Sequence, residues 1–301
     1  MNRNTGLFSS DYAFEKHNNG ICQSKLSELA SIGPATVERW YHDYLKVSVS
    51  RWKNDPCPMV MGIDEHFFSR KKGYATTICD LKNHRVFDVT LGRTEVSLAS
   101  YFNNLNGKEK VKVVVMDLAD HYRSLIAKHL PKALIVADRF HVIRLVNHHF
   151  LKLWQQIDPI GRKNRGLLSL MRRHEWNLSI QQRESLTLYL SNNGALKTIY
   201  EVKQELTKLL LIKRQTAREC RKLIPIFLDY VSKLKNAIFE PLVTLGKTLE
   251  SWQKEVVRMW RFTKSNGITE GFHTKMEMIS RRAFGFRNFE NYRLRVKALC
   301  A

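Results

Sequence analysis

The chain of 301 residues is long enough for about two domains with a sizeable core, and 44% hydrophobic and 10% aromatic residues are ordinary for a globular protein. Fifty Lys and Arg against 28 Asp and Glu give a formal net charge of +22, spread along the sequence, which favours a nucleic-acid partner. The sequence shows no long apolar span, signal peptide or lipidation motif that would indicate a membrane protein. Five scattered cysteines without a C-x-x-C pair fit a reducing cytosol and argue against a disulfide framework or a zinc ribbon.

The N-terminal segment, residues 1–50, predicts a small DNA-binding element. Residues 1–19 are polar and mixed, and we expect an irregular lead-in there. Two helical patterns then follow on either side of a Gly-Pro break at residues 31–36, which is the pattern of a helix-turn-helix. Thr36 and Arg39 fall near the start of the second helix, where a recognition helix contacts DNA. Any small helical hairpin would give the same pattern, so both interpretations stay open.

The next segment, residues 55–145, predicts an α/β domain with seven elements in the order βββαβαβ. The elements are strands at 59–68, 74–79 and 85–91, a helix at 95–105, a strand at 113–116, a helix at 121–130 and a strand at 133–137. Short turns between the first three strands demand antiparallel hairpins, and the helices supply the crossovers that parallel neighbours need. This is the order of the ribonuclease-H-like fold, a mixed sheet with helices on both faces.

Strand patterns disappear after residue 146, and we expect an all-helical insertion over residues 146–262. Asn193, Pro225 and Pro241 should divide it into several helices. Its basic clusters are explained equally well as solvated faces or as a surface that grips DNA. Residues 263–301 then form a final helix and a basic C-terminal end.

Carboxylates at the strand ends are the candidate functional groups. Asp117 and Asp138 each follow a buried strand, although each could simply cap the helix that comes next. In the expected strand order the first strand lies beside the fourth, which brings Asp64 next to Asp117. Two ionised carboxylates that close repel one another unless a cation neutralises them, and Mg²⁺ or Mn²⁺ prefer such oxygen ligands. A third acid from a helix over the sheet would complete a site for two ions about 3.5–4 Å apart, suited to in-line phosphoryl transfer on DNA.

Five sequence blocks together resemble the ISL3 family of bacterial insertion-sequence transposases, over about residues 55–299. They are Gly62-Ile63-Asp64-Glu65, Met116-Asp117 with Tyr122, Ala137-Asp138-Arg139-Phe140-His141, Ser265-Asn266-Gly267 with Glu270-Gly271, and Lys275 to Asn288. The resemblance implies a DDE triad of Asp64, Asp117 and Glu270, which would be both catalytic and metal-binding, with Mg²⁺ or Mn²⁺, in two ions, as cofactor. From the residues alone, Glu270 is equally an acid in the first turn of a helix. Asp138 and His141 resemble a D-x-x-H element that supports the site.

The resemblance also implies the partners. They would be double-stranded DNA, both the terminal inverted repeats of the element and its target, and further copies of the chain in a homo-oligomer in the bacterial cytoplasm at the nucleoid. Basic residues of the final segment are the expected DNA contacts, together with Thr36 and Arg39. They are Lys275, Arg281, Arg282 and Arg287.

The sequence departs from the family pattern at three points. A cysteine-paired zinc ribbon ahead of the helix-turn-helix is absent, which suggests an N-terminally shortened copy, and His273 and Glu277 stand where the family pattern has Asn and a basic residue. Besides an active transposase, two hypotheses therefore stay open: a catalytically inactive DNA-binding remnant or regulator, and a host nuclease or resolvase on the same fold.

Overall fold

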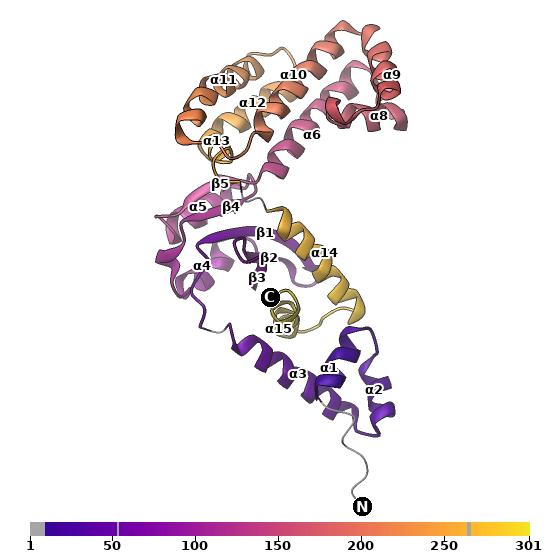
Figure 1. The fold of residues 1–301 in the computed structure, drawn as a ribbon, viewed down its shortest axis with the longest axis vertical. Helices are drawn as coiled ribbons and strands as arrows, with labels where there is room; N and C mark the ends of the chain where they lie inside the picture. Colours follow the sequence, from indigo (N-terminus) through magenta and orange to yellow (C-terminus); the bar gives the residue numbers. More distant parts are fainter. Residues whose placement is uncertain (1–9, 53, 264–265) are drawn as a thin grey trace, which may run out of the picture. The chain divides into compact units, whose positions relative to one another are not determined.

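The computed structural model describes residues 10–52, 54–263 and 266–301 (Figure 1). The chain divides into two compact units, which we describe separately. The first contains the described residues up to Val114, together with 121–133 and 267–301. The second contains residues 115–120 and 134–266. None of the described helices is both long enough and apolar enough to cross a membrane.

A five-stranded sheet has the strand order β3-β2-β1-β4-β5, as the sequence predicts. The strands are β1 (Val60–Ser69), β2 (Gly73–Asp80), β3 (Arg85–Leu91), β4 (Val113–Met116) and β5 (Leu134–Ala137). β2 pairs antiparallel with β1 and with β3, and its register places Thr77 opposite Asp64. The connections into β4 and β5 each contain a helix, which is the crossover that a parallel neighbour requires. A mixed sheet with helices is therefore confirmed.

The first unit also contains four helices that follow or pack on these strands. They are α4 (Glu95–Asn103), α5 (Asp120–His129), α14 (Gly267–Arg282) and α15 (Phe289–Leu299). α4 begins at a capping box, in which the side chain of Thr94 accepts a hydrogen bond from the backbone N–H of Ser97. α14 packs on β1, and α15 packs on β3, α14 and α3. The end of the chain thus lies against the strands that begin the domain.

The N-terminal helices are α1 (Ser10–Asn18), α2 (Gln23–Ala30) and α3 (Pro34–Ser50). The predicted pair of helices is present, with Pro34 in the first turn of α3, although DNA binding by it stays a prediction. The irregular lead-in was wrong for α1, and residues 1–9 lie outside the described part. α1 forms because Ala13 is fully buried and the ring of Phe14 packs 4.0 Å from that of Tyr44. The ring of His17, 4.6 Å from that of Tyr41, and the hydrogen bond from Oη of Tyr41 to Asn18 add to the packing of α1 on α3.

The second unit is helical after β5, as expected for the insertion. Its helices are α6 (Arg139–Ile157), α7 (Pro159–Lys163), α8 (Arg165–Arg172), α9 (Ile180–Ser191), α10 (Gly194–Leu211), α11 (Ala217–Lys235), α12 (Glu240–Ser251) and α13 (Gln253–Arg258). α6 packs on α10 and α12, and α11 packs on α12. One core of this unit is built around Phe150, Trp154 and Met171.

The expected division of this helical unit holds at two of three positions. The side chain of Asn193 caps α10, and Pro241 lies in the first turn of α12. Pro225, in contrast, lies inside α11 and does not end it. Pro225 is on the exposed side of the helix, where water can satisfy the carbonyl that loses its N–H partner.

Candidate metal centre

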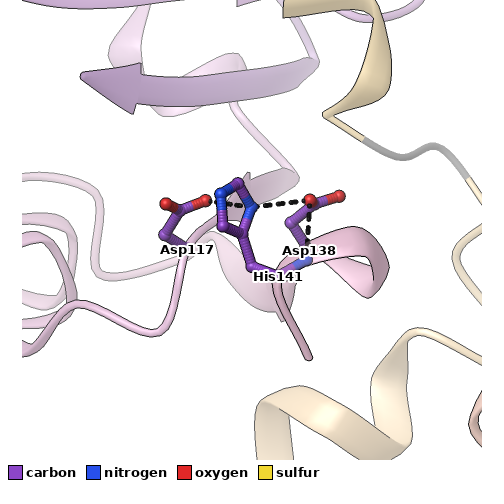
Figure 2. A group of neighbouring side chains, drawn as sticks. All are labelled: Asp117, Asp138 and His141. Atoms are coloured by element: carbon purple, nitrogen blue, oxygen red, sulfur yellow. Dashed lines mark hydrogen bonds and ion pairs between the residues drawn. The ribbon is translucent and has the colours of Figure 1, made fainter. Parts of the chain in front are cut away.

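Asp117, Asp138 and His141 come together in the second unit (Figure 2). Asp117 directly follows β4, Asp138 directly follows β5 and caps α6, and His141 is in the first turn of that helix. Nδ1 of His141 lies 2.7 Å from Oδ1 of Asp117 and 2.9 Å from Oδ2 of Asp138. Within the described ranges, this is the one group of three or more His, Cys, Asp or Glu side chains spaced to hold a metal ion.

The position of His141 between two carboxylates fixes its protonation. A bare Nδ1 lone pair would face two anionic oxygens, so Nδ1 carries a proton that lies between Asp117 and Asp138. Burial by itself lowers the pKa of His141, but hydrogen bonding to Asp117 and Asp138 and the charges of these carboxylates outweigh it and raise the pKa to about 10. His141 therefore supplies a proton to this group rather than a lone pair for a metal ion.

Asp117 lies on the other side of the same imidazole. Its Oδ1 is 2.7 Å from Nδ1 of His141 in an ion pair. The charge of the protonated imidazole therefore offsets part of the repulsion between the two carboxylates. The oxygens of Asp117 and Asp138 that lie within 4.8 Å of each other are also the kind of ligand that a hard cation such as Mg²⁺ or Mn²⁺ prefers.

Asp138 is the structural anchor of this group. Its side chain is 1% exposed and accepts hydrogen bonds at both oxygens. Oδ2 accepts from Nδ1 of His141, and Oδ1 accepts from the backbone N–H of Asn266 at 2.9 Å. Asn266 is 128 positions further along the chain, immediately before α14 begins. The carboxylate thus joins the start of the helical insertion to its end.

Arg139, the next residue, connects the group to the surrounding helices. Its guanidinium is largely buried and donates from Nε to the carbonyl of Leu210 at 3.1 Å and from Nη2 to that of Ile212 at 3.0 Å. Nη2 also donates to the carbonyl of Met259. These carbonyls lie at the C-terminal ends of α10 and α13, where helices leave such groups unsatisfied. The sequence motif around Arg139 gives no sign of this role, because the three carbonyls lie more than 70 positions further along the chain.

Asp64 belongs to the first unit, in the middle of β1. Its carboxylate is mostly buried, and Oδ1 accepts a hydrogen bond from the backbone N–H of Glu65 at 2.8 Å. Oδ2 lies 3.8 Å from Nδ1 of His273, which is on α14. Burial lowers the pKa of His273 to about 4, so this imidazole is neutral near pH 7.

Glu270 is in the first turn of α14, three residues before His273, and its side chain is exposed. It lines a cavity of about 540 Å³ in the first unit together with His66, Phe67, Phe68 and His273, among others. Asp64 and Glu270 thus lie in the first unit, and Asp117, Asp138 and His141 in the second. The convergence of the three acids of the triad remains a prediction.

The predicted DNA contacts lie on α3 and α14 of the first unit, except Arg287, which follows α14. Arg39 is exposed and Thr36 half-buried on α3. Lys275 donates to the backbone carbonyl of Leu299, Arg281 pairs with Glu277 at 2.7 Å, and Arg282 donates to that of Asn18 at 2.7 Å. Arg287 follows α14 and is exposed. Lys275 and Arg282 therefore also hold the first unit together, a use that the sequence did not indicate.

Comparison with known proteins decides the family. The model of the ISL3 family of DDE transposases, described as Transposase, matches residues 61–296. The chain belongs to this family. The transposase for insertion sequence element IS1001 of Bordetella parapertussis is 25% identical to it over 249 residues, which cover 79% of the chain and 60% of that protein. The transposase for insertion sequence element IS1557 of Mycobacterium tuberculosis is 22% identical over 269 residues, with 76% and 57% covered.

This ISL3-family chain therefore spans about 60% of the length of the curated relatives it matches. The matched range contains Asp64, Asp117, Asp138, His141 and Glu270. The resemblance expected from the sequence blocks at residues 55–299 is confirmed over nearly its whole extent.

Proposed function

We propose that this ISL3-family chain carries the catalytic centre of a transposase that cuts and joins DNA at insertion-sequence ends with the help of divalent cations. Asp64, Asp117 and Glu270 would be the catalytic and metal-binding residues. The observation that carries the proposal is the family match over residues 61–296, which contains all three acids. The distribution of charge supports it, because a net charge of +22 suits a polyanionic substrate.

The three acids would act through their charge and their fixed positions. Two bound Mg²⁺ or Mn²⁺ ions would supply an activated water or 3′-hydroxyl and stabilise the leaving 3′-oxygen. Asp64 is held for this task by the backbone N–H of Glu65, which donates to Oδ1. Asp117 offers its carboxylate directly after β4, and Glu270 extends from the first turn of α14.

Asp138 and His141 would support the centre rather than bind the cation. The proton on Nδ1 of His141 occupies one oxygen of Asp138, and the N–H of Asn266 occupies the other. Both residues would hold the carboxylate of Asp117 in position, as residues hydrogen-bonded to metal ligands commonly do.

The DNA partner would be the terminal inverted repeats of the element and its target, bound by the chain as a homo-oligomer at the bacterial nucleoid. Thr36, Arg39, Lys275, Arg281, Arg282 and Arg287 would contact the phosphate backbone. Each such contact lowers affinity as salt rises, so binding should weaken steeply with ionic strength.

The test is a cleavage and strand-transfer assay on linear DNA that carries the element's own ends, with Mg²⁺ or Mn²⁺. We expect Asp64→Asn, Asp117→Asn and Glu270→Gln each to abolish both reactions while binding to the same DNA in a gel shift persists. Glu277→Gln on α14 and Asp229→Asn on α11 are matched controls, because both carboxylates are exposed and ion-paired at the surface.

Full activity in any one of the three variants would remove that acid from the triad. If the wild type binds the ends yet neither cuts nor joins them, the inactive DNA-binding regulator is the better description. If it cuts DNA regardless of the ends, a host nuclease or resolvase on the same fold is favoured.

A further inference from the structure

A continuous line of polar contacts inside the first unit leads from α15 to Asp64. Oη of Tyr292 lies 2.9 Å from Nε2 of His66, and Nδ1 of His66 lies 2.9 Å from Oγ1 of Thr77. Oγ1 of Thr77 also lies 3.0 Å from Nε2 of His273, whose Nδ1 is 3.8 Å from Oδ2 of Asp64. The residues of this line come from β1, β2, α14 and α15.

The hydroxyl of Thr77 gives the line a direction. Thr77 is fully buried, and its one hydroxyl proton stands between two imidazole nitrogens. It can donate to only one of them, so the other imidazole must donate to Oγ1. Only two arrangements of the protons satisfy this requirement when both imidazoles are neutral, one running from Tyr292 to Asp64 and the other in reverse.

Both ends of the line favour the first arrangement. In it, Tyr292 donates to His66, His66 donates from Nδ1 to Thr77, Thr77 donates to Nε2 of His273, and Nδ1–H of His273 faces Asp64. In the reverse arrangement a lone pair of His273 would face the Asp64 carboxylate. The phenol proton of Tyr292, which is 3% exposed, would also have no acceptor, since His66 is its one hydrogen-bond partner among the described residues.

An additional proton on His273 would leave the result at Asp64 unchanged, because imidazolium carries an N–H at both nitrogens. The orientation of the N–H toward Asp64 therefore follows from contacts and proton counting. The 3.8 Å separation exceeds a hydrogen bond, so this N–H acts on the carboxylate as an oriented dipole.

We propose that Tyr292, His66 and Thr77 hold His273 as the tautomer protonated at Nδ1, and that His273 is thereby a positioning residue for Asp64. Oδ1 of Asp64 is fixed by the N–H of Glu65, and Oδ2 faces the N–H of His273. One oxygen is thus hydrogen-bonded, and the other faces an oriented N–H dipole, before a cation arrives. This proposal rests on the proposed function for its consequence, since it concerns a residue expected to bind the cation.

The proton order is tested by nitrogen NMR on the full chain labelled with ¹⁵N-histidine, without metal or DNA. Signals of His273 are assigned by their loss in His273→Asn. We expect the wild type to show the tautomer protonated at Nδ1, and Thr77→Val to shift His273 toward the tautomer protonated at Nε2. A wild-type His273 protonated at Nε2 with a bare Nδ1 would overturn the proposal.

Thr76→Val is the matched control for Thr77→Val. Thr76 is the neighbouring fully buried residue of β2, but its hydroxyl bonds to the carbonyl of Gly92 and to Oη of Tyr122 instead. It makes the same chemical change without touching the line of contacts, and the tautomer of His273 should remain as in the wild type. The same shift in both variants would mean that general loosening of β2, rather than the Thr77 hydroxyl, moves the proton.

The positioning role is tested by titration with Mn²⁺ alone. His273→Leu removes the N–H and should weaken Mn²⁺ binding by about tenfold, the lower end of the range for residues behind metal ligands. His273→Asn keeps an N–H donor and should restore most of the affinity. Equal affinity in His273→Leu and the wild type would refute the role of His273. A wild type that binds no Mn²⁺ would instead refute the proposed function, while the tautomer measurement still decides the proton order.

Discussion

Nδ1 of His141 lies 2.7 Å from Oδ1 of Asp117 and 2.9 Å from Oδ2 of Asp138. One protonated imidazole nitrogen therefore stands between two carboxylates. Asp138 also accepts a hydrogen bond from the backbone N–H of Asn266, so the two acids differ in how they are held.

Removal of His141 should expose the repulsion between these acids. We expect His141→Ala to lower the free energy of unfolding by about 1–3 kcal/mol, because Asp138 loses a charge-assisted hydrogen bond at a buried oxygen. Mn²⁺ should recover part of the loss by taking over the neutralisation. Urea unfolding with and without Mn²⁺ measures both effects. His148→Ala, an exposed position on the same helix, is the control, and an equal loss there would contradict the explanation.

Arg139 should matter more for stability than any exposed arginine of α6. Arg139→Ala leaves three carbonyls at helix ends without their donor, and we expect a loss of about 3–5 kcal/mol in the free energy of unfolding. Arg139→Lys should recover little, because an ammonium group cannot reproduce the forked geometry of the guanidinium. Arg144→Ala is the matched control. Chemical denaturation monitored by the circular dichroism of the helices measures both losses. A loss no larger than that of Arg144→Ala would contradict the stabilising role of Arg139.

Lys203 should make stability depend on pH in the alkaline range. Burial lowers its pKa to about 8, and its ammonium donates to the carbonyls of Met171 and Arg173 without a carboxylate partner. Between pH 8 and the ordinary lysine pKa near 10.5, the unfolded chain binds more protons than the folded one at this site. Its contribution to the free energy of unfolding therefore rises with pH through this window, by about 3 kcal/mol in total.

Lys203→Met should remove this contribution, so the difference in unfolding free energy between wild type and variant should change by that amount from pH 7.5 to 10.5. Denaturant unfolding at a series of pH values measures it. Lys208→Met, exposed on the same helix, should show a constant difference from wild type. A flat difference for Lys203→Met as well would mean that this lysine titrates normally.

Arg293 should be essential for docking α15 on β3. It donates to both oxygens of the buried Asp88, at 2.7 and 2.6 Å. Arg293→Met should cost about 3–5 kcal/mol of unfolding free energy, because a buried carboxylate loses its main partner. The double variant with Asp88→Asn should be less impaired than the sum of the two single changes, and thermal unfolding of all four proteins measures the coupling. Additive losses would show that the pair contributes no coupling.

The order of the elements could be predicted from the sequence because apolar periodicity reports directly on buried strands and helices. The valine-rich run at residues 113–116 and the helical periods after residue 146 are examples. Apolar periodicity does not predict an element correctly where only a few of its residues are buried. In α1 only Ala13 is fully buried, so its apolar period is weak. Pro225 predicts a helix break, but its exposed position in α11 tolerates proline without one.

In the candidate site, too, the sequence predicts the local contacts but not the long-range ones. Asp138 and His141 are three residues apart at a helix start, so local geometry alone brings them together. The contact of Thr77 with His273 joins residues 196 positions apart, and that of His66 with Tyr292 joins residues 226 positions apart. No spacing in the sequence records such contacts, because they arise only when α14 and α15 pack on the strands.

The hydrogen bond from Asn266 to Asp138 has a consequence for how such chains can vary. The helical segment departs and returns at one carboxylate, so its two ends keep a fixed spacing whatever lies between them. Helices within that segment can therefore change in length or number, while α14 still begins directly after Asn266.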